Sequence, residues 1–315
     1  MEQSKIFLKM LTMMAALFIF VLTGCDNSTV DPEDGEPTTD QAAFEKLADE
    51  DSSLASFDPN YDEGGLADIL GKVTTDIYPL RVGQKMRIVN RTLSVEIVGD
   101  TAYGTLTKTF EGVLFIAASY DSTATQPDSV FQKPFTSVMV RKLIFVRIAN
   151  TPRPWRNWKI AAISLPEGGT PNRNIDITKT TIIMPDGEEI VITSPNEFFL
   201  SRGPQWWRQL PSILRGDSVR VKVELTSAYE EEDFVTLTFG ADRNGLHRVK
   251  RKFNLVSSTP SGGVYVKVYE QYFKSHQIPG FFHAIINAFP KQVIFDDVAP
   301  VESESWGIPY MVRMF

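Results

Sequence analysis

The stretch SVEIVGDTAYGTLT, residues 94–107, predicts a tight β-hairpin. Apolar and polar residues alternate on both sides of Gly99 and Asp100, as they do in two strands that each bury one face. A glycine at the first central position suits a two-residue hairpin turn. The pairing predicted across this turn sets residues of the same buried face opposite each other: Ile97 with Ala102, Val95 with Gly104, and Leu93 with Leu106.

Two amphipathic helices are predicted before this hairpin, and more strands after it. Apolar residues recur at spacings of three and four from Phe44 to Ala55, and again from Leu66 to Ile77. Helices followed by an antiparallel sheet predict an α+β domain over residues 41–167. The further strands are expected at residues 110–119, 136–149 and 157–164.

Two motifs in this region resemble the nuclear transport factor 2-like superfamily. They are SVEIVGDTAYGTLT and RNWKIAAIS, residues 156–164. Members of that superfamily often show a strand, Gly-Asp, a small residue and a strand, and they finish on a Trp-Lys-Ile strand. The resemblance implies a cone-like domain, in which a curved sheet wraps around helices and leaves a pocket. That fold includes isomerases and dehydratases, and also members that only bind or dimerise.

A break at LPEGGTPNRN, residues 165–174, is predicted to separate this cone from a second domain. Strands dominate after it, and TTIIMPDGEEIVIT, residues 180–193, contains a Pro-Asp-Gly turn between two of them. Residues 219, 221, 223 and 225 are all apolar and alternate with charged residues. An all-β sandwich domain, immunoglobulin-like, is therefore expected over residues 175–315, although no cysteine pair supports that subtype.

The N-terminus has the layout of a secretory signal over residues 1–24. Lys5 and Lys9 precede a charge-free apolar run that is too short to span a bilayer core. The residues LTGC that end it resemble the bacterial lipobox, which implies that Cys25 becomes the first mature residue and carries lipid. The alternative is a free or buried thiol, but a lone cysteine has no disulfide partner in an oxidising compartment.

Residues 25–40 read as a disordered acidic tether because they are rich in Pro, Gly, Ser and Thr and contain no aromatic residue. Residues 26–68 hold fourteen acidic side chains against Lys46 alone, so most of the chain's negative charge lies near the tether. The acidic run resembles a surface-export signal, whereas Asp26 resembles an inner-membrane retention cue. The choice of membrane and leaflet stays open, as does whether the protein faces the periplasm or the cell surface.

Signatures of catalysis and of cofactor binding are lacking. His247, His276 and His283 have no metal-ligand spacing, and no serine lies in GxSxG. We therefore expect no metal site and no cofactor. The sequence Arg215-Gly216-Asp217 is typical of a turn. Nucleic-acid binding is not expected, because the basic residues near the C-terminus read as the solvent face of a strand.

Three hypotheses about function remain. The first is a lipid-anchored envelope protein with a non-enzymatic binding or assembly role, whose partner is an envelope protein or a glycan. The second is a small-molecule lyase or isomerase that uses a cone pocket in residues 41–167, where Asp76 and Tyr78 lie near the end of the second helix. The third is a carbohydrate-binding accessory lipoprotein that uses Trp206 and Trp207, since adjacent tryptophans can stack on a sugar.

Overall fold

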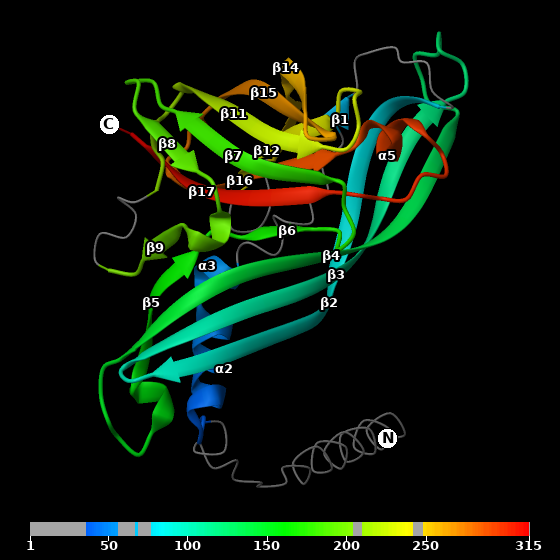
Figure 1. Ribbon diagram of the computed structural model, residues 1–315. Coiled ribbons are helices and arrows are strands. Elements are labelled where there is room, and N and C mark those ends of the chain that lie inside the picture. The colour runs from blue at the N-terminus through cyan, green and yellow to red at the C-terminus, as the bar shows by residue number, and fades with distance from the viewer. Residues whose placement is uncertain (1–35, 56–66, 69–76, 204–209, 242–247, 315) are drawn as a thin grey trace, which may run out of the picture. The chain divides into compact units, whose positions relative to one another are not determined.

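Two β-sheets make up most of the part of the chain that the structure describes (Figure 1). The computed structural model describes residues 36–55, 67–68, 77–203, 210–241 and 248–314. Within them one sheet has 12 strands and the other five. The large sheet contains β1 (Ala67–Asp68), β2 (Tyr78–Val98), β3 (Thr101–Ser119), β4 (Ser129–Arg147), β5 (Trp158–Ser164), β6 (Glu167–Gly169), β9 (Phe199–Ser201), β10 (Ser212–Leu214), β12 (Phe234–Ala241), β13 (Val249–Lys252), β16 (Gly280–Phe289) and β17 (Glu304–Arg313). The five-stranded sheet contains β7 (Ile175–Ile183), β8 (Glu189–Ile192), β11 (Ser218–Ser227), β14 (Asn254–Ser261) and β15 (Val264–Lys274).

Strands β2, β3 and β4 form a long antiparallel unit, which we call the ribbon. The hairpin predicted at Gly99 and Asp100 is confirmed, and Gly99 adopts the positive φ of 63° that its turn position favours. The predicted register is also confirmed in all three pairs: Ile97 with Ala102, Val95 with Gly104, and Leu93 with Leu106. The second hairpin strand does not end where the prediction ended it, because it continues through residues 110–119 as the single 19-residue β3.

Short helices cover the two ends of one face of the ribbon. Near the hairpin, α2 (Asp40–Glu50) and α3 (Ser52–Ala55) pack Phe44 and Leu54 into a cluster with ribbon residues such as Phe145. The Phe44 and Phe145 rings lie 4.7 Å apart. At the far end, α5 (Lys291–Phe295) packs Val293 against the ribbon. The 3₁₀ turns η1 (Pro154–Arg156) and η2 (Pro195–Glu197) flank β5 and β9.

Strand β6 joins the ribbon to the rest of the large sheet. Its residue Gly169 pairs with Val138 of β4 on one side and with Glu304 of β17 on the other. The predicted break at residues 165–174 therefore contains a strand that hydrogen-bonds to both halves of the chain. Thr38–Phe315 form one compact unit.

The second half of the chain contains the β-sandwich. The five-stranded sheet packs on β12, β16 and β17, and the alternation predicted in β11 is confirmed. Its four apolar side chains are all buried: Val219, Val221, Val223 and Leu225. The Pro-Asp-Gly turn lies between β7 and β8 as predicted, where Gly187 donates its amide to the Met184 carbonyl at 3.0 Å. The immunoglobulin-like subtype stays a prediction.

The predicted fold class, an α+β cone followed by a separate sandwich domain, is wrong. The described residues are mostly strand, and α2, with 11 residues, is the longest of the helices among them. The second predicted helix lies largely outside the described residues, and Ala67–Asp68 within it form strand β1. The physical reason is the length of β3. This 19-residue alternating strand is too long for the short helices to cover, so several different elements cover it and no cone filled by helices forms.

Candidate functional site

The ribbon has one covered and one open face. Along β3, every second residue from Ala102 to Ala118 is buried, and every residue between them is exposed or half-buried. Because neighbours on a strand point to opposite faces, the side chains from Thr101 to Ala117 form a continuous row on the second face. Strand β4 adds a matching row from Val130 to Val146. We call this second surface the open face.

The β3 and β4 rows of the open face carry little charge. Glu111 is the only charged side chain in the β3 row, and Lys142 the only one in the β4 row. The remaining positions are mostly threonine, β-branched or aromatic: Thr101, Tyr103, Thr105, Thr107, Thr109, Val113, Phe115, Ala117, Val130, Gln132, Pro134, Thr136, Val138, Val140, Ile144 and Val146. None of these apolar side chains belongs to a hydrophobic cluster formed by described residues. In its β3 and β4 rows the open face is therefore nearly uncharged, whereas the matching β2 row carries Arg81, Lys85, Arg87 and Glu96. Lys142 pairs with Glu197 of η2, and the face lies outside the hydrophobic clusters of the described residues.

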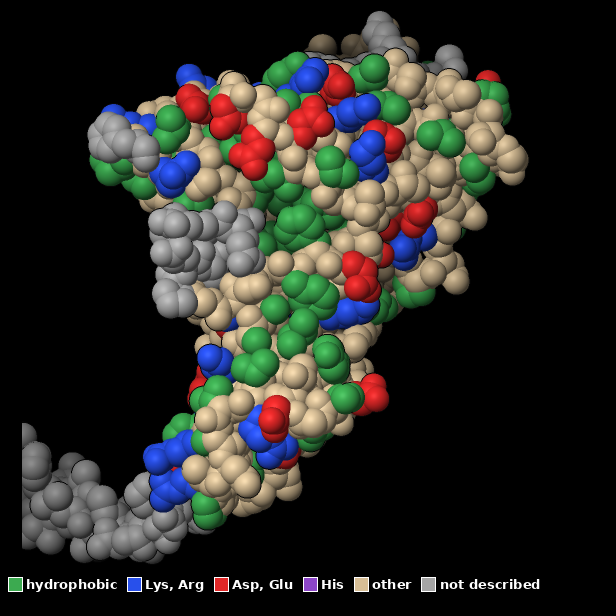
Figure 2. Space-filling model, turned by 60° about the vertical axis from the view of Figure 1, so that its left-hand side comes forward, with side chains coloured by type: hydrophobic (Ala, Val, Ile, Leu, Met, Phe, Trp, Pro, Cys, Tyr) green, Lys and Arg blue, Asp and Glu red, His purple; other side chains and the backbone are tan. Residues whose placement is uncertain are grey.

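Other surfaces of the protein differ from the open face. The outward side of the five-stranded sheet carries ion pairs, such as Lys179 with Glu224 at 2.9 Å and Arg220 with Glu270 at 3.9 Å. The upper part of Figure 2 shows acidic and basic side chains interspersed in this way. A solvated sheet face normally looks like this, since charged side chains keep it in water. The β3 and β4 rows of the open face differ from this surface in having few charges.

A shallow groove of about 370 Å³ crosses the ribbon at the half of the open face away from the hairpin. It runs over all three strands, from Lys85 and Arg87 on β2 to Pro134 on β4. The apolar side chains of the open face that line it are Val113, Phe115 and Pro134. Arg87 and Glu111 pair at 2.7 Å beside the groove. The groove is thus apolar in its middle and charged at its margin.

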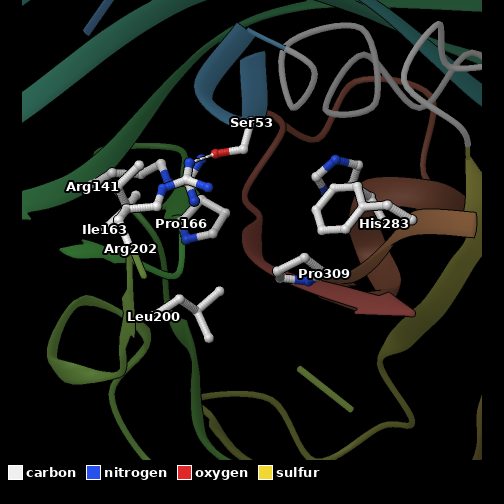
Figure 3. Close-up of a pocket in the computed structure, with 9 residues that line it drawn as sticks. Ser53, Arg141, Ile163, Pro166, Leu200, Arg202, His283 and Pro309 are labelled. Atoms are coloured by element: carbon white, nitrogen blue, oxygen red, sulfur yellow. Dashed lines mark hydrogen bonds between the residues drawn. The ribbon is translucent and has the colours of Figure 1, made fainter. Parts of the chain in front are cut away.

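A small cavity of about 10 Å³ lies elsewhere, where β5, β9, β16 and α3 meet (Figure 3). Arg202 makes two hydrogen bonds to Asp51, at 2.7 and 2.9 Å, and also donates to the Ser53 hydroxyl. His283 lies across the cavity from Ser53, and its ring meets Phe281 edge-on at 4.9 Å. Space of this size holds about one water molecule. We interpret the cavity as a packing junction that ties α3 to β9.

Electrostatics agree with this interpretation. Burial, together with the nearby Arg141 guanidinium, lowers the pKa of His283 to about 3, so the imidazole is neutral at physiological pH. The Ser53 hydroxyl is held by a guanidinium, and Figure 3 shows it turned away from the histidine. A serine nucleophile needs a base within hydrogen-bond reach, so this pair lacks the geometry of a hydrolase.

A buried carboxyl lies beside β6. Glu304 is 1% exposed, accepts a hydrogen bond from the Trp306 indole at 3.1 Å and from the Ile177 amide, and faces Arg173 at 3.4 Å. Burial raises the pKa of Glu304 to about 7, although Arg173 opposes the rise. All these partners belong to the protein itself, so Glu304 fastens β17 to β7 and does not face a substrate.

Several residues singled out from the sequence lie outside the described residues: Cys25, Asp76, Trp206, Trp207 and His247. Tyr78 begins β2, and no partner carboxyl brings it into a catalytic pair in the described structure. Arg215-Gly216-Asp217 forms the turn between β10 and β11, as predicted, with the Asp217 amide donating to the Leu214 carbonyl at 3.1 Å. Among the described histidines, His283 is buried and His276 packs against Phe282.

Sequence reasoning missed the open face. Its signal is the row TYTTTEVFA on alternate positions of residues 101–117, in which one residue in nine is charged. In the part of the chain that the structure describes, no three His, Cys, Asp or Glu side chains come together as a metal site. The described helices are all too short or too polar to cross a bilayer. The sequence matches no known protein family, and a search of curated proteins finds no significant relative.

Proposed function

We propose that this protein is a lipid-anchored component of the cell envelope that acts, without catalysis, by binding another protein through the open face of its ribbon. One observation carries the proposal: the open face is long, nearly uncharged along β3 and β4, and outside every hydrophobic cluster of the described residues. Large exposed surfaces of this kind are typical of interaction sites. Charges on the edge strand β2, such as Lys85 and Arg87, fit the usual anatomy of an interface, which has a polar rim.

Anchoring is proposed from the sequence. Cys25, at the end of the lipobox-like LTGC, lies outside the described residues. Two or three acyl chains on it would hold the protein stably at a membrane, since each buried methylene contributes about 0.8 kcal/mol. The acidic segment that follows has the composition of a tether, which would leave the ribbon free to meet a partner.

The other two hypotheses have less support. The lyase or isomerase depended on a cone pocket, and that prediction falls with the cone. The carbohydrate-binding hypothesis depends on Trp206 and Trp207, which lie outside the described residues. A glycan ligand would need an aromatic platform, and the open face offers mainly threonine and valine.

A charge placed in the middle of the open face tests this function. Thr107→Arg introduces a guanidinium that a partner would have to desolvate, whereas Thr259→Arg adds the same charge on the exposed strand β14. The full protein is extracted from membranes in mild detergent, and complexes are sized by native electrophoresis. We expect the wild type and Thr259→Arg to migrate as one complex and Thr107→Arg as the monomer. An unchanged complex in a folded Thr107→Arg would contradict the proposal.

A further inference from the structure

We infer that the partner on the open face is a second copy of this chain, related by a two-fold axis that passes near Thr109. This inference rests on the proposed function and names the occupant of the same surface. Three properties of the open face support it: its area, its self-complementary order of residues, and the placement of its charges.

The area of the open face matches what a stable dimer buries. A 19-residue strand is roughly 60 Å long, and three strands are roughly 14 Å wide, so the face covers on the order of 900 Å². Each partner of a standard interface buries about 800 Å². The face is therefore large enough for a specific dimer without help from other surfaces.

The order of residues along β3 is self-complementary about Thr109. Tyr103 and Phe115 lie at equal distances on either side of this residue, so a two-fold axis there brings Tyr103 of one copy toward Phe115 of the other. Tyr103 is 52% exposed and projects from the face, whereas Phe115 lines the groove. Packed sheets cross at about 30°, so the contact between the two ribbons would be closest near the axis.

The same axis also suits the few charges of β3. Thr107 and Glu111 are equally spaced from Thr109, so each Glu111 carboxylate comes near a Thr107 hydroxyl of the other copy, which can donate to it. Besides Glu111, the β3 positions nearest the axis are threonines, Thr107 and Thr109, and most other charges of the face lie on the edge strand β2. A flat threonine surface of this kind can pack closely against its own copy, and the tyrosines provide the aromatic anchors that interfaces favour.

A cysteine near the axis tests the inference. Thr109→Cys is made in the full protein, together with Thr259→Cys on β14 as the control, and both are treated with a thiol cross-linker that spans about 10 Å, the spacing of packed sheets. We expect covalent homodimers from Thr109→Cys and none from Thr259→Cys. Purified monomer that does not cross-link at position 109 at any concentration would overturn the inference.

Affinity provides a second, independent readout. Tyr103 and Tyr272 are each 52% exposed, but Tyr272 lies on β15, away from the ribbon. We expect Tyr103→Ala to raise the dissociation constant of the dimer at least tenfold in sedimentation experiments, as for an aromatic hot spot, and Tyr272→Ala to leave it unchanged. Equal effects of the two substitutions would contradict the two-fold arrangement.

The two proposals can fail separately. If Thr109→Cys in intact membranes cross-links only to a different protein, the second copy is excluded while the open face remains a binding surface. If Thr109→Cys gives no adduct of any kind and Thr107→Arg leaves complex size unchanged, both proposals are wrong.

Discussion

Thr170 and Ser303 hold each other by a reciprocal pair of hydrogen bonds. The Thr170 amide donates to the Ser303 carbonyl at 2.9 Å, and the Ser303 amide donates to the Thr170 hydroxyl at 2.9 Å. The two residues are 133 positions apart in the chain. This contact fixes the end of β6 against the start of β17, and so attaches the ribbon to the sandwich.

Gly169, the residue before Thr170, should not tolerate any side chain. Gly169 has a φ of 147°, and a Cβ on it would lie 2.2 Å from the Ser303 carbonyl oxygen. We expect Gly169→Ala to lower the free energy of unfolding by about 4 kcal/mol or more, because backbone strain and a backbone clash add together. Urea denaturation followed by tryptophan fluorescence measures this loss of unfolding free energy.

Gly187→Ala is the matched control. Gly187 also has a positive φ, of 91°, but a Cβ there would meet nothing within 4 Å. Only conformational strain remains, so the expected loss is about 1 to 2 kcal/mol. Similar losses for the two variants would show that the approach of β17 to Gly169 does not stabilise the fold.

Lys133 should stabilise the fold at the end of the ribbon away from the hairpin. Its ammonium donates to the backbone carbonyls of Val293, Asp296 and Ala299 at 2.8, 2.5 and 2.9 Å. Lys133→Met keeps the aliphatic stem but leaves these carbonyls without their donor. We expect a loss of about 3 kcal/mol in unfolding free energy. The exposed Lys159→Met should change it by less than about 0.5 kcal/mol, and an equally mild effect of Lys133→Met would argue against this role.

Glu304 should make stability fall as the pH rises. Its pKa is raised from 4.5 to about 7 in the folded protein by burial. Between these two values the folded chain keeps a proton that the unfolded chain has released, so folding is favoured at the acidic side and stability is lost as the pH rises through 7. The loss approaches roughly 3 kcal/mol, since one pKa unit corresponds to about 1.4 kcal/mol.

Glu304→Gln removes this dependence, because the amide stays neutral. We expect the unfolding free energy of the variant, relative to wild type, to increase by roughly 2 to 3 kcal/mol between pH 5 and pH 8. The exposed Glu188→Gln controls for the loss of one negative charge. Wild-type and Glu304→Gln curves that run parallel from pH 5 to pH 8 would refute the assignment.

Cys25 is predicted to carry the membrane anchor. Cys25→Ala should abolish incorporation of labelled fatty acid and move the protein from the membrane to the soluble fraction after cell disruption, because the acyl chains provide the binding energy. A variant that stays membrane-bound and acylated would show that the anchor lies elsewhere. Trp206→Ala serves as a processing control.

Local patterns predicted the local structure well. The period-two alternation and the Gly99-Asp100 turn give the hairpin register residue by residue, because a one-residue slip would expose every buried side chain. The buried faces of β11 and the Pro-Asp-Gly turn follow for the same reason. Each of these features depends on neighbours within about a dozen positions.

Long-range pairing was not predictable in this way. The glycines of residues 165–174 predict a break between two domains, whereas Gly169 is required because β17 approaches its backbone closely. Glycine in a strand and glycine in a linker look alike in a single sequence. The cone was wrong for a related reason, since alternation in β3 shows which residues are buried but not which element covers them.

The open face could be predicted in part from the sequence. Threonine and valine on alternate positions of β3 and β4 show an exposed row with few charges. The sequence alone does not show that a charged row of β2 lies beside it, or that the structure leaves it outside the hydrophobic clusters. The chemistry of the surface could be predicted, but its extent could not.

A photoreactive amino acid placed at position 107 tests whether the open face contacts a partner in living cells. The same residue at position 259, on β14, gives the background. We expect a discrete adduct after irradiation from position 107 and none from position 259. A chain that is expressed, folded and anchored but gives no adduct from position 107 would contradict binding through the ribbon.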